Sequence, residues 1–198
     1  HFDVLCDGKF YCHMDLGVLG RHNTMNALAV AATSWVMGIP GQKVTDGVKA
    51  FHGAGRRMEY KGEYRGAKVY DDYAHHPDEL RATLEAVRGM GDHRIVLAFQ
   101  PHTYTRTKLL MDDFVRELKK ADVVVLAEIY AARESNTIGI SSADLAEKIP
   151  GSTYCETLQD VTDCLRSIVR EGDIVLTMGA GDIFRAGEAL LSGEDSKK

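Results

Sequence analysis

The sequence predicts an open, doubly wound α/β domain over residues 56–192, with a smaller segment of strands and helices before it. Short apolar runs alternate with amphipathic helical segments from residue 56 onward, a pattern typical of parallel strands joined by right-handed crossovers. Unusual polar clusters follow four of these runs, at the strand ends where open sheets bind ligands. The chain is 44% hydrophobic, which is enough to bury a core.

The N-terminal segment begins with a predicted β-hairpin. Phe2–Cys6 and Lys9–His13 read as short strands around Asp7-Gly8, a tight-turn dipeptide. The chain starts at His1 without a methionine, inside this expected strand. We therefore expect the sequence to be a piece of a longer polypeptide.

Two helices are predicted after the hairpin. Ala27–Met37 is an Ala-rich helix ended by Gly38 and Pro40. Lys43–Phe51 is amphipathic, because its apolar residues recur at helical spacing on one face. The glycines of 52–55 break this helix, and we place a domain boundary there, between residues 1–54 and 55–198.

The elements of the second domain follow from its alternating pattern. Strands are predicted where three to seven residues are apolar or alternate in polarity, at Met58–Tyr64, Ala67–Tyr70, Ile95–Phe99, Val123–Leu126, Thr153–Cys155 and Ile174–Thr177. Pro77 suits the first turn of a helix. Helices are predicted at 77–90, Lys108–Lys120, Ala143–Ile149, Leu158–Val169 and Asp182–Leu191.

Charge and composition argue against several classes of function. The net charge is −5 and no run of Lys and Arg forms a basic stripe, which argues against nucleic-acid binding. The longest apolar stretch, Ala27–Met37, contains Thr33 and Ser34 and is too short to cross a bilayer. The four cysteines lack metal-site spacing, which favours reduced thiols in a cytosolic protein.

The cluster VYDDYAHHPD, residues 69–78, has the highest density of candidate functional side chains. One interpretation is structural, with an Asp capping the next helix and His76 beside Pro77 in a fold-stabilising role. Adjacent histidines do not easily share one metal ion, so a metal centre is disfavoured. Carboxylate and imidazole groups also suit ribose hydroxyls, or an anionic substrate met by a protonated histidine.

The cluster QPHTYTRTK, residues 100–108, lies between a buried strand and a helix start. Backbone N–H groups and the helix dipole favour an anion there, with Arg106 available for bidentate contact. The alternative is an ordinary loop with a surface Arg and Lys. Arg56 and Arg57, at the domain boundary, also have two interpretations: they contact a ligand, or they are solvated surface charges.

Two further motifs are ambiguous. In GRHNTMN, Asn23 is either a helix cap or, with Asn26, part of an amide pair for a base edge. TMGAGD, residues 177–182, lacks the dinucleotide-binding spacing, so its glycines serve close approach to a ligand or tight strand–helix packing. The sequence contains no Walker-type phosphate loop and no Gly-x-Ser-x-Gly nucleophile elbow.

Taken together, these motifs resemble those of the Mur ligase family over about residues 2–190. The residues that carry the resemblance are GRHNTMNALA, GRRMEY, DDYAHHPDEL, FQPHTYTRTK, IYAARE, GISS and TMGAGDI, in this order. FQPHTYTRT is more similar to the alanine-adding branch than to its peptide-recycling relative. Leu19 and Met58 depart from the family pattern, where proline and phenylalanine are frequent.

The resemblance implies a three-domain enzyme with an N-terminal UDP-binding domain, a central ATP-binding domain and a C-terminal Rossmann-like domain. Residues 1–54 would be the remnant of the central domain and residues 55–198 the C-terminal domain. The phosphate loop and the Mg²⁺ ligands would lie in the missing part, with no metal site in this fragment. The fragment would therefore not catalyse ligation alone.

The implied reaction is ATP-dependent amide ligation in cytoplasmic peptidoglycan synthesis. ATP would phosphorylate the carboxylate of UDP-N-acetylmuramate, and the amine of L-alanine would attack the acyl phosphate. By the same resemblance, Asn23 and Asn26 would contact adenine, Arg57 the ATP phosphates and Asp72 the ribose. The alternatives are a stand-alone, non-catalytic nucleotide- or anion-binding module, a scaffold domain, and a peptide-recycling relative.

The resemblance also implies which residues would face L-alanine and the muramoyl carboxylate. These are Tyr73, His75, His102 and Arg106. Thr103 stands where some members have Arg, so a carboxylate clamp would rest on Arg106. No residue of this chain is assigned a catalytic role, and Arg56 and Arg133 are left without a role.

Overall fold

The computed structural model describes residues 1–18 and 20–193, so Leu19 and the end of the polar tail lie outside the described residues. The chain divides into two compact units, His1–Gly55 and Arg56–Lys198. Within the described residues, no helix is both long and apolar enough to cross a membrane.

The first unit is a β-hairpin with two helices. Strands β1 (Phe2–Cys6) and β2 (Lys9–Met14) are antiparallel, and the turn residues Asp7 and Gly8 both have positive φ, as a two-residue hairpin turn requires. Helices α1 (Arg21–Val36) and α2 (Gly41–Lys49) complete the unit. Its buried core consists of Val4, Cys12, Met14, Ala27, Ala31 and Val44.

Helix α1 begins six residues before the predicted Ala27, because Gly20 takes the N-cap position with φ 97°. Asn23 is therefore inside the helix and is not its cap. Asn23 and Asn26 lie three residues apart on one face, and the Asn26 amide donates to Asn23 Oδ1 at 3.4 Å. The amide pair is thus present in the structure.

The second unit contains a six-stranded sheet in the order β3-β4-β8-β5-β6-β7. Only β3 is antiparallel to its neighbour, and the other pairings are parallel. The strands are β3 (Glu59–Tyr64), β4 (Ala67–Asp72), β5 (Ile95–Phe99), β6 (Val123–Ala127), β7 (Thr153–Cys155) and β8 (Ile174–Met178). The predicted mostly parallel, doubly wound fold class is confirmed.

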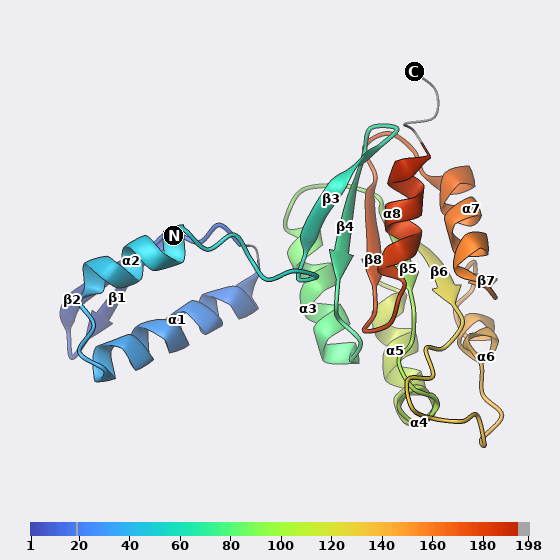
Figure 1. Ribbon diagram of the computed structural model, residues 1–198, viewed down its shortest axis with the longest axis horizontal. Helices are drawn as coiled ribbons and strands as arrows, with labels where there is room; N and C mark the ends of the chain where they lie inside the picture. Colours follow the sequence, from blue (N-terminus) through green and yellow to red (C-terminus); the bar gives the residue numbers. More distant parts are fainter. Residues whose placement is uncertain (19, 194–198) are drawn as a thin grey trace. The chain divides into compact units, whose positions relative to one another are not determined.

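Helices cover both faces of this sheet, as Figure 1 shows. One buried cluster joins the sheet to α3 (Pro77–Arg88), α5 (Met111–Leu118) and α6 (Ser142–Glu147). A second cluster, on the opposite face, joins it to α7 (Leu158–Ile168) and α8 (Phe184–Ser192). Central strands that are covered on both sides explain the continuous apolar runs in the sequence.

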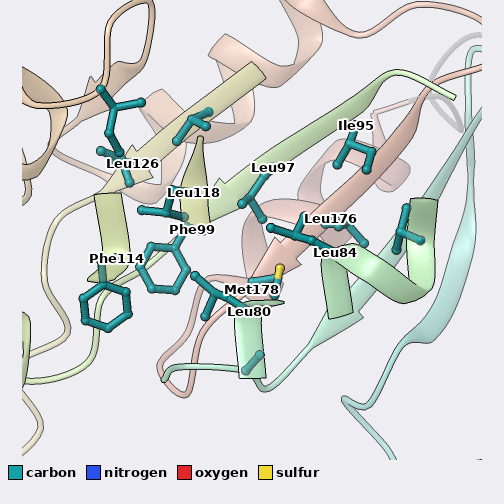
Figure 2. Packing of buried hydrophobic residues seen from close by; sticks show 14 of the residues in the cluster. Leu80, Leu84, Ile95, Leu97, Phe99, Phe114, Leu118, Leu126, Leu176 and Met178 are labelled. Carbon is teal, nitrogen blue, oxygen red and sulfur yellow. The ribbon is translucent and has the colours of Figure 1, made fainter. Parts of the chain in front are cut away.

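Strand β5 illustrates this double burial. Ile95, Leu97 and Phe99 pack into the cluster with α3 and α5, whereas Val96 and Ala98 face α7 and α8. Figure 2 shows Phe99 beside Phe114 of α5, and their ring centroids are 5.5 Å apart. The sheet is thereby fixed as a rigid platform for the loops at its carboxyl edge.

Several boundaries differ from the prediction. The helix expected over Lys108–Lys120 is two helices, α4 (Tyr104–Leu109) and α5, separated at Leu110. No Gly or Pro marks this break, and α4 starts earlier because contacts from the loop after β6 hold its first turn. Strand β4 continues to Asp72 because both of its terminal carboxylates pair within the fold.

The start of α2 offers a test of the first unit. A Cβ on Gly41 would overlap the backbone carbonyl of Tyr11, whereas a Cβ on Gly47, in the same helix, meets nothing within 4 Å. We expect Gly41→Ala to destabilise α2 by about 1–3 kcal/mol, as overpacking does. Gly47→Ala should stabilise it by up to about 1 kcal/mol, because Ala has the higher helix propensity.

Hydrogen exchange of the α2 amides measures both effects in the 198-residue chain. Equal protection in the two variants would contradict the close approach of α2 to β2.

Candidate functional site

Four polar loops meet at one edge of the six-stranded sheet. They follow β4, β8, β5 and β6, which are consecutive neighbours in the sheet and mutually parallel. Their carboxyl ends therefore lie side by side, as the sequence predicted from the positions of the four clusters. This carboxyl edge is the candidate site.

Asp72 ends β4 and is only 3% exposed. Its Oδ2 accepts the amide of Met58 at 2.9 Å, and its Oδ1 accepts the amide of Ala74 at 2.8 Å. Burial is the largest influence on its pKa and raises it above the ordinary value. Asp72 thus shapes the loop, and a ribose hydroxyl would have to use a second lone pair of one oxygen.

The two histidines of the AHHP element have different environments. His76 is the N-cap of α3, and its Nδ1 accepts the amide of Asp78 at 3.3 Å. Glu79 completes the capping box by accepting the amides of His75 and His76 at 2.9 and 3.2 Å. The structural interpretation of His76 is the one observed, while His75 faces the other loops of the edge.

A row of rings runs along the carboxyl edge. Tyr73 and His75 have centroids 5.4 Å apart, His75 and His102 are 5.6 Å apart, and His102 stacks on Tyr130 at 5.8 Å. Arg106 Nη1 lies 3.5 Å from His102 Nδ1. The structure therefore brings together Tyr73, His75, His102 and Arg106, and adds Tyr130, which the sequence did not single out.

The pKa of His102 is lowered by its surroundings. Burial lowers its pKa below the ordinary 6.5, and the positive charge of Arg106 lowers it further. The neutral ring presents Nδ1 as an acceptor towards Arg106. His75 Nδ1 lies 2.9 Å from the carbonyl of Tyr73, and when it carries the proton it donates to that oxygen. Arg106 therefore carries the permanent positive charge of this pair.

The loop that carries His102 is strained and is braced from the next loop. Thr103 has φ 67°, which is unfavourable for a β-branched residue, and its amide donates to the carbonyl of Tyr130 at 2.9 Å. Glu134 accepts the amide of Thr105 at 2.9 Å, and hydrogen bonds from the Thr105 hydroxyl and amide lower the pKa of Glu134. Glu134 thereby caps the start of α4, a role that its position in the sequence did not reveal.

The glycines after β8 serve close packing. A Cβ on Gly181 would overlap Gln100 Oε1 and lie 2.6 Å from Cγ of Tyr130, and one on Gly179 would lie 2.7 Å from the Gln100 carbonyl. Gln100 itself donates to Asp182 at 3.0 Å and accepts the amide of Ile183 at 3.1 Å. Gly179 and Gly181 therefore allow close packing of this loop against Gln100 and Tyr130 of the neighbouring loops, while approach to a ligand stays a prediction.

The adjacent arginines at the start of the second unit also differ. Arg56 donates to Asp71 at 2.7 Å and to backbone carbonyls of the β8 loop. Arg57 is half exposed, and its nearest carboxylate is Glu79 at 3.7 Å. Arg57 is therefore available to an anion, and Arg56 is engaged by the fold.

The other residues singled out in the sequence lie outside the group of side chains described above. Arg133 is exposed, and within the described residues no group of three or more His, Cys, Asp or Glu could hold a metal ion. Asn23 and Asn26 belong to the first unit, where α1 presents them on one face. The carboxyl edge thus concentrates one exposed arginine, one arginine beside an imidazole, and a row of rings.

This arrangement defines an α/β domain whose carboxyl edge gathers arginine, histidine and tyrosine side chains. The family model for the Mur ligase glutamate ligase domain matches residues 56–181. The chain belongs to the Mur ligase family.

Individual relatives show which members of the family this chain is similar to. The UDP-N-acetylmuramate–L-alanine ligase of Lachnospira eligens is 45% identical over 96% of this chain. The chain spans 42% of that relative's length. The crystal structure of UDP-N-acetylmuramate–alanine ligase MurC from Thermotoga maritima matches 97% of this chain and 42% of its own, with TM-score 0.80 and 29% identity. The murein peptide ligase of Psychrobacter arcticus, at 22% identity and TM-score 0.66 over 90% of this chain and 38% of its own, shows the fold alone.

The environment of His102 gives a testable titration. We expect its pKa below 6.5 in the native chain, and Arg106→Met should raise it because a neighbouring positive charge is removed. Lys108→Met, in the same helix, is the control and should leave the pKa unchanged. A pH titration of the ring resonances by NMR measures all three. Titration of native His102 at or above 6.5 would contradict the assignment.

Proposed function

We propose that this chain is the C-terminal part of an ATP-dependent UDP-N-acetylmuramate–L-alanine ligase. The observation that carries the proposal is the gathering of Tyr73, His75, His102 and Arg106 at one sheet edge in a chain 45% identical to a relative of that name. The reaction would belong to peptidoglycan synthesis in the cytoplasm, and hence to cell-wall biogenesis, cell shape and division.

The amide bond would form in two steps. ATP supplies a phosphoryl group to the muramoyl carboxylate, and the amine of L-alanine displaces phosphate from the acyl phosphate, so that ADP and phosphate leave. Both steps concentrate negative charge, and fixed cations are the most effective stabilisers of such charge. The amine loses a proton as the amide bond forms, and the residues of this chain would bind and orient the reactants.

Arg106 is the group we assign to the carboxylate side. Its guanidinium has no ion-pair partner among the residues that the structure describes, and the pKa of His102 beside it is lowered, first by burial and then by Arg106 itself. His75 and Tyr73 extend the same row and would position the incoming amino acid. Thr103 contributes a strained backbone that sets the direction of this loop.

The ATP contacts are assigned to both units. Asn23 and Asn26 form an amide pair that can recognise a base edge, and Arg57 offers an exposed guanidinium to the phosphates. Asp72 would hold the ribose through a remaining lone pair, because both of its oxygens already accept backbone amides. Mg²⁺ would be held by residues outside this chain, and no step here is derived through it.

The proposal is tested by the turnover of the full-length enzyme. Arg106→Ala should lower kcat/KM by on the order of 10²-fold, because one preorganised donor to a developing charge is lost. Lys108→Ala is the matched control and should retain activity, since Lys108 is exposed in the same helix. Release of ADP that depends on both L-alanine and UDP-N-acetylmuramate is the measurement.

Three outcomes separate the alternatives. Unchanged kinetics in Arg106→Ala would remove Arg106 from the site. Turnover with a peptide in place of L-alanine would favour a peptide-recycling ligase. Nucleotide binding without turnover in the full-length protein would favour a non-catalytic binding module.

A further inference from the structure

Arg56 makes more polar contacts at the carboxyl edge than its exposed neighbour Arg57. Its Nε donates to Asp71 Oδ2 at 2.7 Å, and its Nη2 and Nη1 donate to the carbonyls of Gly179 and Gly181 at 2.7 and 3.1 Å. One guanidinium therefore ties the end of β4 to the loop after β8. The planar fork of arginine can reach partners in these separate directions, and an ammonium group cannot reproduce that geometry.

Two aromatic rings contact the same guanidinium. Its Cζ lies 5.0 Å from the ring centroid of Tyr73 and 4.6 Å from that of Phe184, the first residue of α8. Both distances are within cation–π range. Tyr73 is thereby held on one side of Arg56, which links this arginine directly to the row of rings at the site.

The backbone around Arg56 is fixed as well. Arg56 has φ 56° and Met58 has φ 48°, so two left-handed residues flank Arg57. The amide of Arg56 donates to Glu59 at 2.7 Å, and its carbonyl accepts the amide of Tyr73 at 2.7 Å. Non-glycine residues hold this conformation only where surrounding contacts over-determine it.

We infer that Arg56 is a positioning residue for the site. It fixes the segment 56–59 on the end of β4 and thereby sets where Arg57 and Tyr73 lie. The identity of the ligand that Arg57 and Tyr73 would contact rests on the proposed function. The positioning of these two residues by Arg56 does not depend on that function.

A second arginine–aspartate pair, at the amino ends of the strands, provides a matched control for the Arg56–Asp71 pair. Arg94, just before β5, donates to both oxygens of Asp173 at 2.9 and 2.7 Å and to the carbonyl of Ile168 at 2.8 Å. Asp173 is as buried as Asp71, with side-chain exposures of 4% and 2%. The two arginines have the same chemistry, and only Arg56 contacts residues of the candidate site.

The experiment compares Arg56→Met with Arg94→Met in the 198-residue chain. Both should lower resistance to urea, because each leaves a buried carboxylate unpaired. Only Arg56→Met should shift the ring resonances of Tyr73 and the backbone resonances of Arg57 in NMR spectra. Equal shifts of these resonances in both variants, or in neither, would overturn the inference.

Two further variants separate charge from position. Arg56→Lys keeps the positive charge but loses the fork, and should shift the Tyr73 resonances while it retains a folded sheet. Arg56→Met with Asp71→Asn removes the unpaired carboxylate, and should recover urea resistance without restoring those resonances. Recovery of both would show that Arg56 acts only as an ion-pair partner.

Activity adds an independent readout in the full-length enzyme. Arg56→Lys should lower kcat/KM by on the order of 10²-fold, since a displacement near 1 Å in a positioning group has such effects. Arg94→Lys should change it by less than about threefold. If the wild-type enzyme shows no ligase turnover, the proposed function fails, and the NMR comparison still decides the role of Arg56.

Discussion

The carboxyl edge depends on how two consecutive buried carboxylates at the end of β4 are satisfied. Neighbouring side chains of a strand point to opposite faces, so Asp71 and Asp72 cannot share donors. Asp71 takes Arg56 and the hydroxyl of Thr177, whereas Asp72 takes the amides of Met58 and Ala74. A buried carboxylate without partners would cost several kcal/mol, so the surrounding loops are constrained to these positions.

This constraint also separates the roles of similar residues. Arg56 is used to neutralise a buried charge, and Arg57 next to it remains half exposed. His76 starts a helix, and His75 next to it joins the ring row. In each pair one residue pairs within the loop or caps a helix, and the other contacts the ring row or remains exposed.

The sequence predicted the fold class and the meeting of the polar clusters at one sheet edge, because both follow from patterns with a clear physical origin. Doubly buried strands such as Ile95–Phe99 are apolar throughout, and polar clusters at their ends must meet at one edge. Partners between loops could not be predicted. Glu134 caps α4 from 29 residues away, and Tyr130 stacks on His102, and neither contact leaves a local signal in the sequence.

The early start of α4, before the predicted Lys108, has the same origin. Helix propensity extends through Leu110, but the start of α4 is set by the strained Thr103 and by Glu134, both held by the loop after β6. Arg106 consequently lies on a short helix whose direction is fixed by its neighbours and not by its own sequence. The direction matters because Arg106 adds to the effect of burial in lowering the pKa of His102, and a displaced Arg106 would no longer make that contribution. Tertiary contacts, more than local propensity, therefore set the electrostatics of the site.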